Sequence, residues 1–266
     1  MTRELVLLKL GGSLITDKDK PYTPRLDKLA SLSKEIKAAL DSSPNLSLIL
    51  GHGSGSFGHV AAKKYGTRDG VQTREQWLGF TEVRFQAAEL NRFVVQSLLE
   101  AGLPALPFPP SASLVSDNRK VTLHNIAPIR KALEANLLPV VQGDVAFDES
   151  LGGTILSTED VFKFLVEQFA PTRIRLAGIE AGVWEDYPAR TRLVKQIQLS
   201  DYEAMRSGIQ CSASTDVTGG MKAKVEEMLS LIREKEGLTA QIFSAEEHGM
   251  LTRALRGENV GTLLTA

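Results

Sequence analysis

The sequence reads LVLLKLGGS from Leu5 to Ser13, an almost wholly apolar run that ends at a pair of glycines. A short run without polar alternation predicts a strand that is covered on both faces. Later runs have the same form, and glycine or serine follows each within two residues. These runs are Leu46–Leu50, Leu137–Val141, Ile174–Ala177 and Thr239–Phe243. The sequence therefore predicts several buried strands that end in tight turns.

Helical patterns separate these runs. The expected helices are Arg25–Leu40, Arg74–Ala101, Ile126–Asn136, Thr158–Phe169, Gly220–Lys235 and Glu246–Leu255. Strands that alternate with helices predict an α/β fold with a mainly parallel sheet between helical layers. No long polar or Pro/Gly/Ser-rich linker interrupts the chain, so we expect residues 1–266 to form a single domain. Ligands of such folds bind beyond the carboxyl ends of the strands, which is where this sequence has its glycines.

Composition narrows the class of protein. The chain has 266 residues, 24% of them charged, with a net charge of −1, and it has no basic run of the kind that binds nucleic acid or membrane surfaces. The single cysteine, Cys211, cannot form an internal disulfide. No apolar stretch approaches the roughly 18 residues of a transmembrane helix, and no signal peptide is evident. We expect a cytoplasmic enzyme with neither nucleic acid nor membrane as partner.

Two glycine turns follow predicted strands and suit phosphate binding. Lys9 precedes Gly11, Gly12 and Ser13, so a mobile positive charge stands beside a turn whose backbone N–H groups can converge on an anion. The second turn reads HGSGSFGH from His52 to His59, and a helical segment, Val60–Tyr65, follows it. Alternating glycines before a helix predict a phosphate-binding loop, although no Gly-Lys-Ser/Thr closes it as in a P-loop.

A third glycine turn opens the last long helix. Gly219 and Gly220 precede Lys222 and Lys224, and either Asp216 or Thr218 is a candidate helix cap. Lysines at a helix N-terminus oppose the helix dipole, and a bound anion would relieve that cost. Another strand delivers Asp144, after Gly143, to the same edge of the sheet. Lysines, glycine turns and a carboxylate together fit phosphoryl transfer, which demands positioning and neutralisation of charge.

The order of these motifs along the chain resembles the amino acid kinase family, which includes acetylglutamate, aspartate, carbamate and uridylate kinases. The resemblance rests on Lys9-x-Gly11-Gly12-Ser13, the Gly53–Gly58 loop, Gly143-Asp144 and Gly219-Gly220-Met221-x-x-Lys224. It implies a three-layer αβα sandwich, commonly a homodimer. It also implies that Lys9 and Lys224 contact the transferring phosphoryl group and that Asp144 orients them.

A narrower resemblance is to isopentenyl phosphate kinases. It rests on Ser56-Phe57-Gly58-His59, Lys18, Thr67–Val71 and Asp216–Gly220. It implies that His59 hydrogen-bonds the substrate phosphate and that Lys18 helps bind ATP phosphates. Fosfomycin kinase is similar around the same histidine and is the closest alternative, whereas His52 and His124 gain no such support.

The site residues implied on this basis fall into three overlapping groups. Lys9, Lys18, Lys224, Asp144 and His59 would be catalytic. ATP would contact Lys9, Gly11, Gly12, Ser13, Lys18, Gly55, Glu180, Asp216, Gly219, Gly220, Lys222 and Lys224. The acceptor would contact Gly53, Ser54, Gly55, Gly58, His59 and Gly143.

Two further features of the sequence concern the expected nucleotide contacts and the expected pocket for the acceptor tail. Many relatives carry Thr-Asp-Val-Asp-Gly-Val-Tyr near the nucleotide, but this chain has neither aspartate in Gly178–Trp184, so Glu180 is a candidate substitute. Trp77, Phe80 and Val83 follow the second glycine loop and are candidates for an apolar pocket around the acceptor tail, with ordinary core packing as the alternative.

The expected reaction is direct in-line transfer of the γ-phosphoryl group of ATP to isopentenyl phosphate, with Mg²⁺ bridging the nucleotide phosphates and no dedicated metal site on the protein. Another small-molecule kinase of the same fold is the first alternative. A non-catalytic nucleotide-binding sensor is the second, but such a sensor needs no lysines to stabilise a transferring group.

Overall fold

The computed structural model describes residues 3–202 and 220–266. Its central sheet has eight strands in the order β12-β14-β13-β9-β1-β2-β6-β3. Neighbouring strands are parallel except for β13 and β14, so the predicted mainly parallel sheet is confirmed. The strands are β1 (Glu4–Leu10), β2 (Leu46–His52), β3 (Ala105–Pro107), β6 (Leu138–Gln142), β9 (Arg173–Gly178), β12 (Gln196–Gln198), β13 (Thr239–Ser244) and β14 (Thr262–Thr265).

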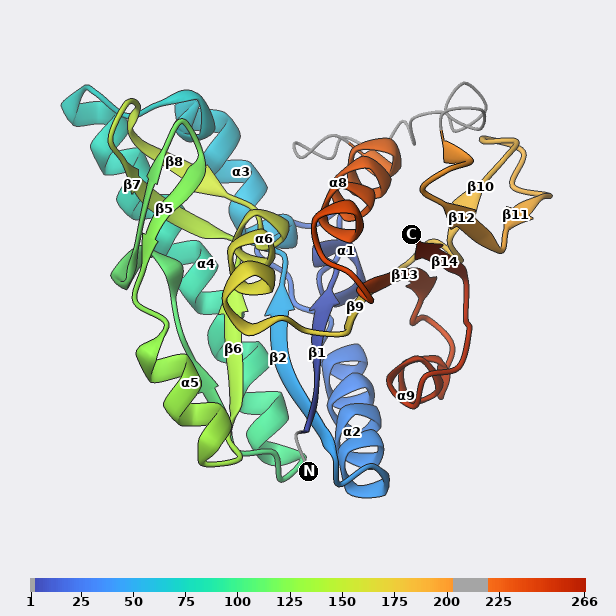
Figure 1. Ribbon diagram of the computed structural model, residues 1–266. Coiled ribbons are helices and arrows are strands. Elements are labelled where there is room, and N and C mark those ends of the chain that lie inside the picture. Colours follow the sequence, from blue (N-terminus) through green and yellow to red (C-terminus); the bar gives the residue numbers. More distant parts are fainter. Residues whose placement is uncertain (1–2, 203–219) are drawn as a thin grey trace.

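Helices cover both faces of this sheet, as the three-layer prediction requires. Figure 1 shows α6 (Thr158–Phe169) and α8 (Gly220–Glu234) in front of the sheet and α4 (Arg74–Glu100) behind it. The rear layer also includes α2 (Leu26–Ser42) and α9 (Met250–Leu255), and α5 (Ala127–Glu134) packs on the front face.

Successive side chains of a strand point to opposite faces, and β1 follows this rule. Val6, Leu8 and Leu10 pack in the core that contains the buried side chains of α2, α4 and α9. Leu7 packs in the other core, with side chains of α6 and α8. By the same alternation, Lys9 points toward α6 and α8. On β2, Leu50 and His52 point toward α4.

Several described helices begin at the carboxyl edge of the sheet, where the site was expected. They include α1 (Gly12–Ile15), α3 (Gly55–Tyr65), α6 and α8. The helix predicted from Val60 instead starts at Gly55, inside the glycine loop, because the N–H groups of Phe57 and Gly58 donate to Ser54 O. The helix predicted from Glu246 starts later, at Met250, after Gly249 adopts a positive φ of 89°.

The sequence patterns did not reveal a second sheet of four strands in the order β5-β4-β7-β8. Its strands are β4 (Leu114–Asp117), β5 (Lys120–His124), β7 (Asp144–Asp148) and β8 (Gly152–Leu156). Side chains from this sheet pack with α3 and α4 in a small third core. A short pair, β10 (Val183–Trp184) and β11 (Leu193–Val194), lies near the C-terminal half of the sheet (Figure 1).

Candidate active site

Lys9, near the end of β1, lies in a buried ion pair. Its Nζ contacts Oε1 of Glu159, the second residue of α6, and both side chains are almost fully buried. The alternation of β1 turns Lys9 to this face, and the capping box of Ser157 and Asp160 fixes the start of α6 there. Lys9 is thus a positive charge held at the sheet edge by a carboxylate.

Lys224, in the first turns of α8, belongs to the same cluster of charges. Burial alone would raise the pKa of Glu159, but the charge and hydrogen bond of Lys9 and the charge of Lys224 hold that pKa below its ordinary value. Glu159 is therefore ionised at neutral pH and attracts both lysines. The cluster thus brings two positive charges, those of Lys9 and Lys224, close to one ionised carboxylate, and such cations suit a transferring phosphoryl group.

The first two glycine turns pack directly against each other. A Cβ on Gly12 would lie 2.5 Å from Gly55 N, and a Cβ on Gly55 would lie 2.2 Å from Oγ1 of Thr16. Thr16 joins the turns because its hydroxyl donates to Gly12 O and accepts from Ser56 N–H. Glycine is required at Gly12 and Gly55 by this backbone contact, and the turns beside Lys9 and before His59 form one surface.

Asp144 begins β7, next to the end of β2, and its partners differ from those implied by the resemblance. Its Oδ2 accepts from the Ser111 hydroxyl at 2.8 Å and lies 3.5 Å from Nε of Arg84. Burial raises the pKa of Asp144, and Arg84 and Ser111 only partly offset this. The carboxylate that contacts Lys9 is Glu159, whereas Asp144 contacts Arg84 of α4.

Comparison with known proteins gives these features a context. A family model described as the amino acid kinase family matches residues 4–244. The chain belongs to the amino acid kinase family. Isopentenyl phosphate kinases of Methanocaldococcus jannaschii and Methanothermobacter thermautotrophicus are 33% and 35% identical to it, over 97% and 98% of this chain and 97% and 99% of theirs. A solved isopentenyl phosphate kinase structure covers 98% of this chain and all of its own, at 29% identity and a TM-score of 0.82.

Within this amino acid kinase, the other residues that the sequence predicted to contact the nucleotide have varied surroundings. Glu180 accepts hydrogen bonds from Trp184 Nε1 at 3.1 Å and from Arg190 at 2.8 Å. Lys18 is exposed on the loop after α1 (Gly12–Ile15), and Lys222 is half-buried on α8. The predictions for Asp216 and Gly219 lie outside the described residues.

The apolar residues proposed for the acceptor tail form a compact cluster. Phe80 and Val83 are buried in the third core, and the Trp77 ring packs edge-on against Phe80 with centroids 5.1 Å apart. Phe147 of β7 covers both aromatic rings, and its own side chain is exposed. This cluster lies between α4 and the β7–β8 hairpin, and its role as a pocket stays a prediction.

Sequence reasoning missed Glu159, Arg84 and Ser111. The segment around Glu159 looked like an ordinary acidic first turn, and only the facing of Lys9 toward α6 gives it a role. Arg84 follows Val83, so it was adjacent to the proposed pocket residues without being singled out. The roles of Glu159 and Arg84 can be recognised only once it is known which helix covers which face of the sheet.

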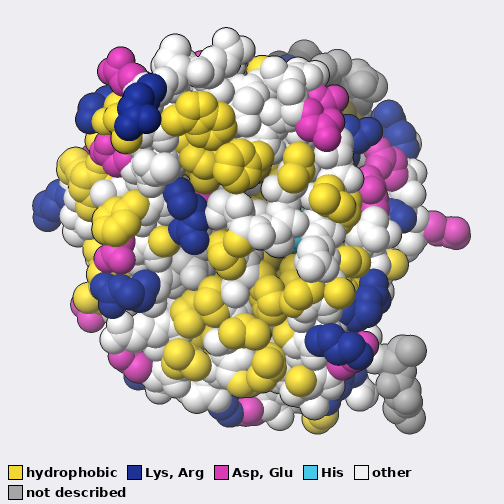
Figure 2. Space-filling view, turned by 90° about the vertical axis from the view of Figure 1, so that its left-hand side faces the viewer, with side chains coloured by type: hydrophobic (Ala, Val, Ile, Leu, Met, Phe, Trp, Pro, Cys, Tyr) yellow, Lys and Arg dark blue, Asp and Glu magenta, His cyan; other side chains and the backbone are white. Residues whose placement is uncertain are grey.

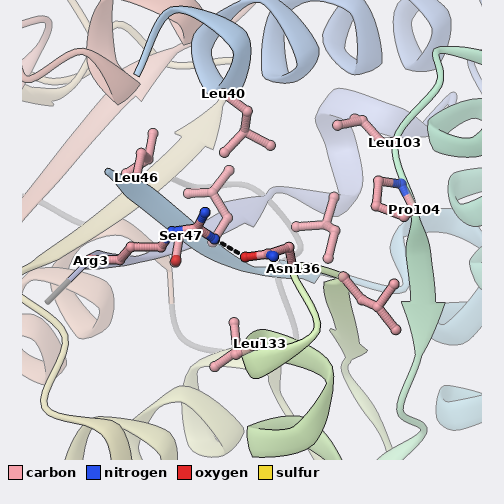
Figure 3. Close-up of a pocket in the computed structure, with 11 residues that line it drawn as sticks. Arg3, Leu40, Leu46, Ser47, Leu103, Pro104, Leu133 and Asn136 are labelled. Atoms are coloured by element: carbon pink, nitrogen blue, oxygen red, sulfur yellow. Dashed lines mark hydrogen bonds between the residues drawn. The ribbon is translucent and has the colours of Figure 1, made fainter. Parts of the chain in front are cut away.

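A separate small cavity lies at the opposite edge of the sheet. Figure 3 shows leucines around it, together with a hydrogen bond from Arg3 to Asn136. None of the proposed site residues lines it. Within residues 3–202 and 220–266 there is no cluster of three His, Cys, Asp or Glu side chains able to hold a metal, and no helix long and apolar enough to cross a membrane.

Proposed function

We propose that this chain transfers the γ-phosphoryl group of ATP to isopentenyl phosphate and so forms isopentenyl diphosphate and ADP. The observation that carries the proposal is the convergence of Lys9 and Lys224 on Glu159, next to a glycine loop that leads to His59. The curated relatives that match nearly the whole chain bear the name of this activity.

The acceptor is itself a nucleophilic anion, so the reaction needs charge compensation more than a general base. Lys9 and Lys224 neutralise charge that accumulates between the two phosphates during in-line transfer. Glu159 holds both lysines in place. His59, on the first turns of α3, donates to the acceptor phosphate, and the N-terminus of α3 adds favourable partial charge.

Mg²⁺ enters this proposal as part of the donor. When bound with the nucleotide, the ion would supply additional charge neutralisation at the phosphates, beside that of Lys9 and Lys224. Lys18, Gly11, Gly12 and Ser13 would bind the same phosphates.

The chain would form a single domain, whose N-terminal part would hold the acceptor and whose C-terminal part would hold the nucleotide. The protein would act in the cytoplasm.

The protein would act as a homodimer through one apolar face. Figure 2 shows hydrophobic side chains gathered on the side of the molecule that carries α4 and the second sheet. The exposed large hydrophobic residues of these elements and of the edge strand β3 are Leu78 and Phe85 of α4, Leu106 of β3 and Phe147 of β7. An edge strand beside exposed apolar side chains suits pairing with a second copy. Light scattering should give twice the monomer mass, and Phe85→Asp should reduce it.

A panel of acceptors tests the proposed activity. The purified chain with ATP and Mg²⁺ is assayed against isopentenyl phosphate, fosfomycin, acetylglutamate and uridylate. Turnover of isopentenyl phosphate well above the others is expected, and His59→Ala should reduce it sharply. Turnover of fosfomycin alone would favour the fosfomycin kinase alternative. Binding of ATP without turnover of any acceptor would favour the sensor.

A further inference from the structure

His52, the last residue of β2, is a buried histidine that the mechanism above does not use. It is 1% exposed, and the alternation of β2 turns it toward α4. There its Nε2 lies 2.9 Å from the side-chain amide of Asn91, which is also buried. On its other side, Nδ1 lies 3.1 Å from the carbonyl oxygen of Gly53. Gly53 is the first residue of the Gly53–Gly58 loop, which the proposed function assigns to the acceptor and which is called the acceptor loop below.

These contacts fix which ring nitrogen carries the proton. A carbonyl oxygen can only accept, so Nδ1 is the donor to Gly53 O. Burial, assisted by the charge of Lys9, lowers the pKa of His52 to about 4, although the Gly53 hydrogen bond opposes this. The ring is therefore neutral at physiological pH, and Nε2 has a lone pair that accepts from the Asn91 amide. Asn91 thus selects the Nδ1–H tautomer.

The orientation of Gly53 O determines where the next N–H group points. In a trans peptide the C=O and the following N–H point in opposite directions, so a Gly53 oxygen held toward His52 turns the Ser54 N–H away from the core. The N–H groups of Gly53, Ser56, Phe57 and Gly58 donate to protein acceptors. Those of Ser54 and Gly55 have no protein acceptor within the described chain.

The backbone of His52 connects the same loop to the rest of the site. Its carbonyl oxygen accepts from Gly143 N–H at 3.1 Å and from the Thr158 hydroxyl at 2.7 Å. Thr158 precedes Glu159, the partner of Lys9. His52 therefore contacts the acceptor loop, the turn before Asp144 and the start of α6.

We propose that Asn91 and His52 are positioning residues for the acceptor, because they hold Gly53 O inward and keep the Ser54 and Gly55 N–H groups directed at the acceptor phosphate. The inference rests on the proposed function only for the identity of that phosphate. It is independent of His59, which would bind the anion directly.

Inorganic phosphate serves as the probe, since it tests the loop without assuming the acceptor. Phosphate should shift the backbone amide NMR signals of Ser54 and Gly55 in the parent protein. In Asn91→Leu the apparent Kd for phosphate should rise about tenfold, equivalent to roughly 1.4 kcal/mol. Ser97→Ala is the matched control, because Ser97 lies on the same helix and its hydroxyl contacts Ser33 instead of the loop. It should bind phosphate as the parent does.

Ring ¹⁵N NMR of the parent tests the tautomer without any variant, and the chain has only four histidines to assign. Protonated Nδ1 and unprotonated Nε2 are expected for His52. In steady-state assays, Asn91→Leu should raise the KM for the acceptor about tenfold and leave the KM for ATP within about twofold.

Nε2–H in the parent, unchanged phosphate binding in Asn91→Leu, or equal rises in both KM values would overturn the inference. Failure of the parent to phosphorylate isopentenyl phosphate would instead refute the proposed function, and the phosphate titration would still decide the role of Asn91 and His52.

Discussion

The start of α6 and the turn between β6 and β7 each bury one carboxylate at the carboxyl edge of the sheet, with opposite results. Glu159 contacts Lys9 and lies near Lys224, and its pKa is lowered. Asp144 contacts Arg84 and Ser111, and its pKa is raised because burial outweighs those partners. Nearly equal burial thus gives different electrostatics, because the partners differ.

This difference assigns separate tasks to the two carboxylates. In the proposed function, Glu159 is the counter-charge of Lys9 and Lys224, and these lysines would face the transferring phosphoryl group. Asp144 ties the start of β7 to α4, on the side of the acceptor loop. The following variants test this division, from the largest expected effect to the smallest.

Lys9→Met should have the largest effect. Loss of a charge at the transferring group should lower kcat by about 10²–10³-fold. The free energy of unfolding should also fall, by about 3–5 kcal/mol, because the buried carboxylate of Glu159 loses its hydrogen-bonded counter-charge. Urea denaturation and initial-rate assays measure the two effects.

The double variant Lys9→Met/Glu159→Gln is the control for this experiment. It should recover most of the lost stability and none of the lost activity. If the single and double variants are equally stable, Glu159 is not the counter-charge of Lys9.

Glu159→Gln and Asp144→Asn separate the two regions kinetically. Glu159→Gln should lower kcat about tenfold or more, since the lysines lose the group that holds them, and one tenfold step corresponds to about 1.4 kcal/mol. Asp144→Asn should lower kcat less, because Ser111 can still donate to the amide oxygen. The reverse order would restore to Asp144 the lysine-orienting role implied by the resemblance.

Replacement of Glu227 of α8 should have a smaller effect on the free energy of unfolding, and this effect should depend on pH. Burial and the charges of Glu159 and Asp160 raise its pKa to about 7. The native state therefore holds a proton that the unfolded state loses near pH 4.5, so its contribution to stability declines as pH rises from 4.5 through 7. Glu227→Gln should raise the free energy of unfolding by about 1 kcal/mol at pH 8 and change it little at pH 4.5. Equal effects at both pH values would show that Glu227 is not protonated in the native state.

Much of the fold could be predicted because the inner strands of the central sheet, β6, β2, β1, β9 and β13, are buried on both faces, whereas the short outer strands β3, β12 and β14 were not predicted. The Leu5–Leu10 pattern and the glycines after it identified β1 and the sheet edge that carries the site. The second sheet was missed because β4, β5, β7 and β8 are four or five residues long and resemble the loops around them.

The site was predicted less completely, for a related reason. Glycine turns and lysines have local sequence patterns, so Lys9 and the Gly53–Gly58 loop could be found. Glu159 and Asn91 acquire their roles only through contacts with residues far along the chain, Lys9 and His52. Such contacts depend on which face each strand presents to which helix, and a single sequence does not reveal that.

Lys224→Ala, with Lys222→Ala as the matched control on the same helix, tests the central claim most directly. The measurement is the rate of isopentenyl diphosphate formation at saturating ATP and isopentenyl phosphate, with the melting temperature of each variant. The account predicts that Lys224→Ala lowers kcat by about 10²-fold or more with a nearly unchanged melting temperature, and that Lys222→Ala retains most activity. An unchanged kcat in Lys224→Ala would contradict the assignment of Lys9, Lys224 and Glu159 to the transferring phosphoryl group.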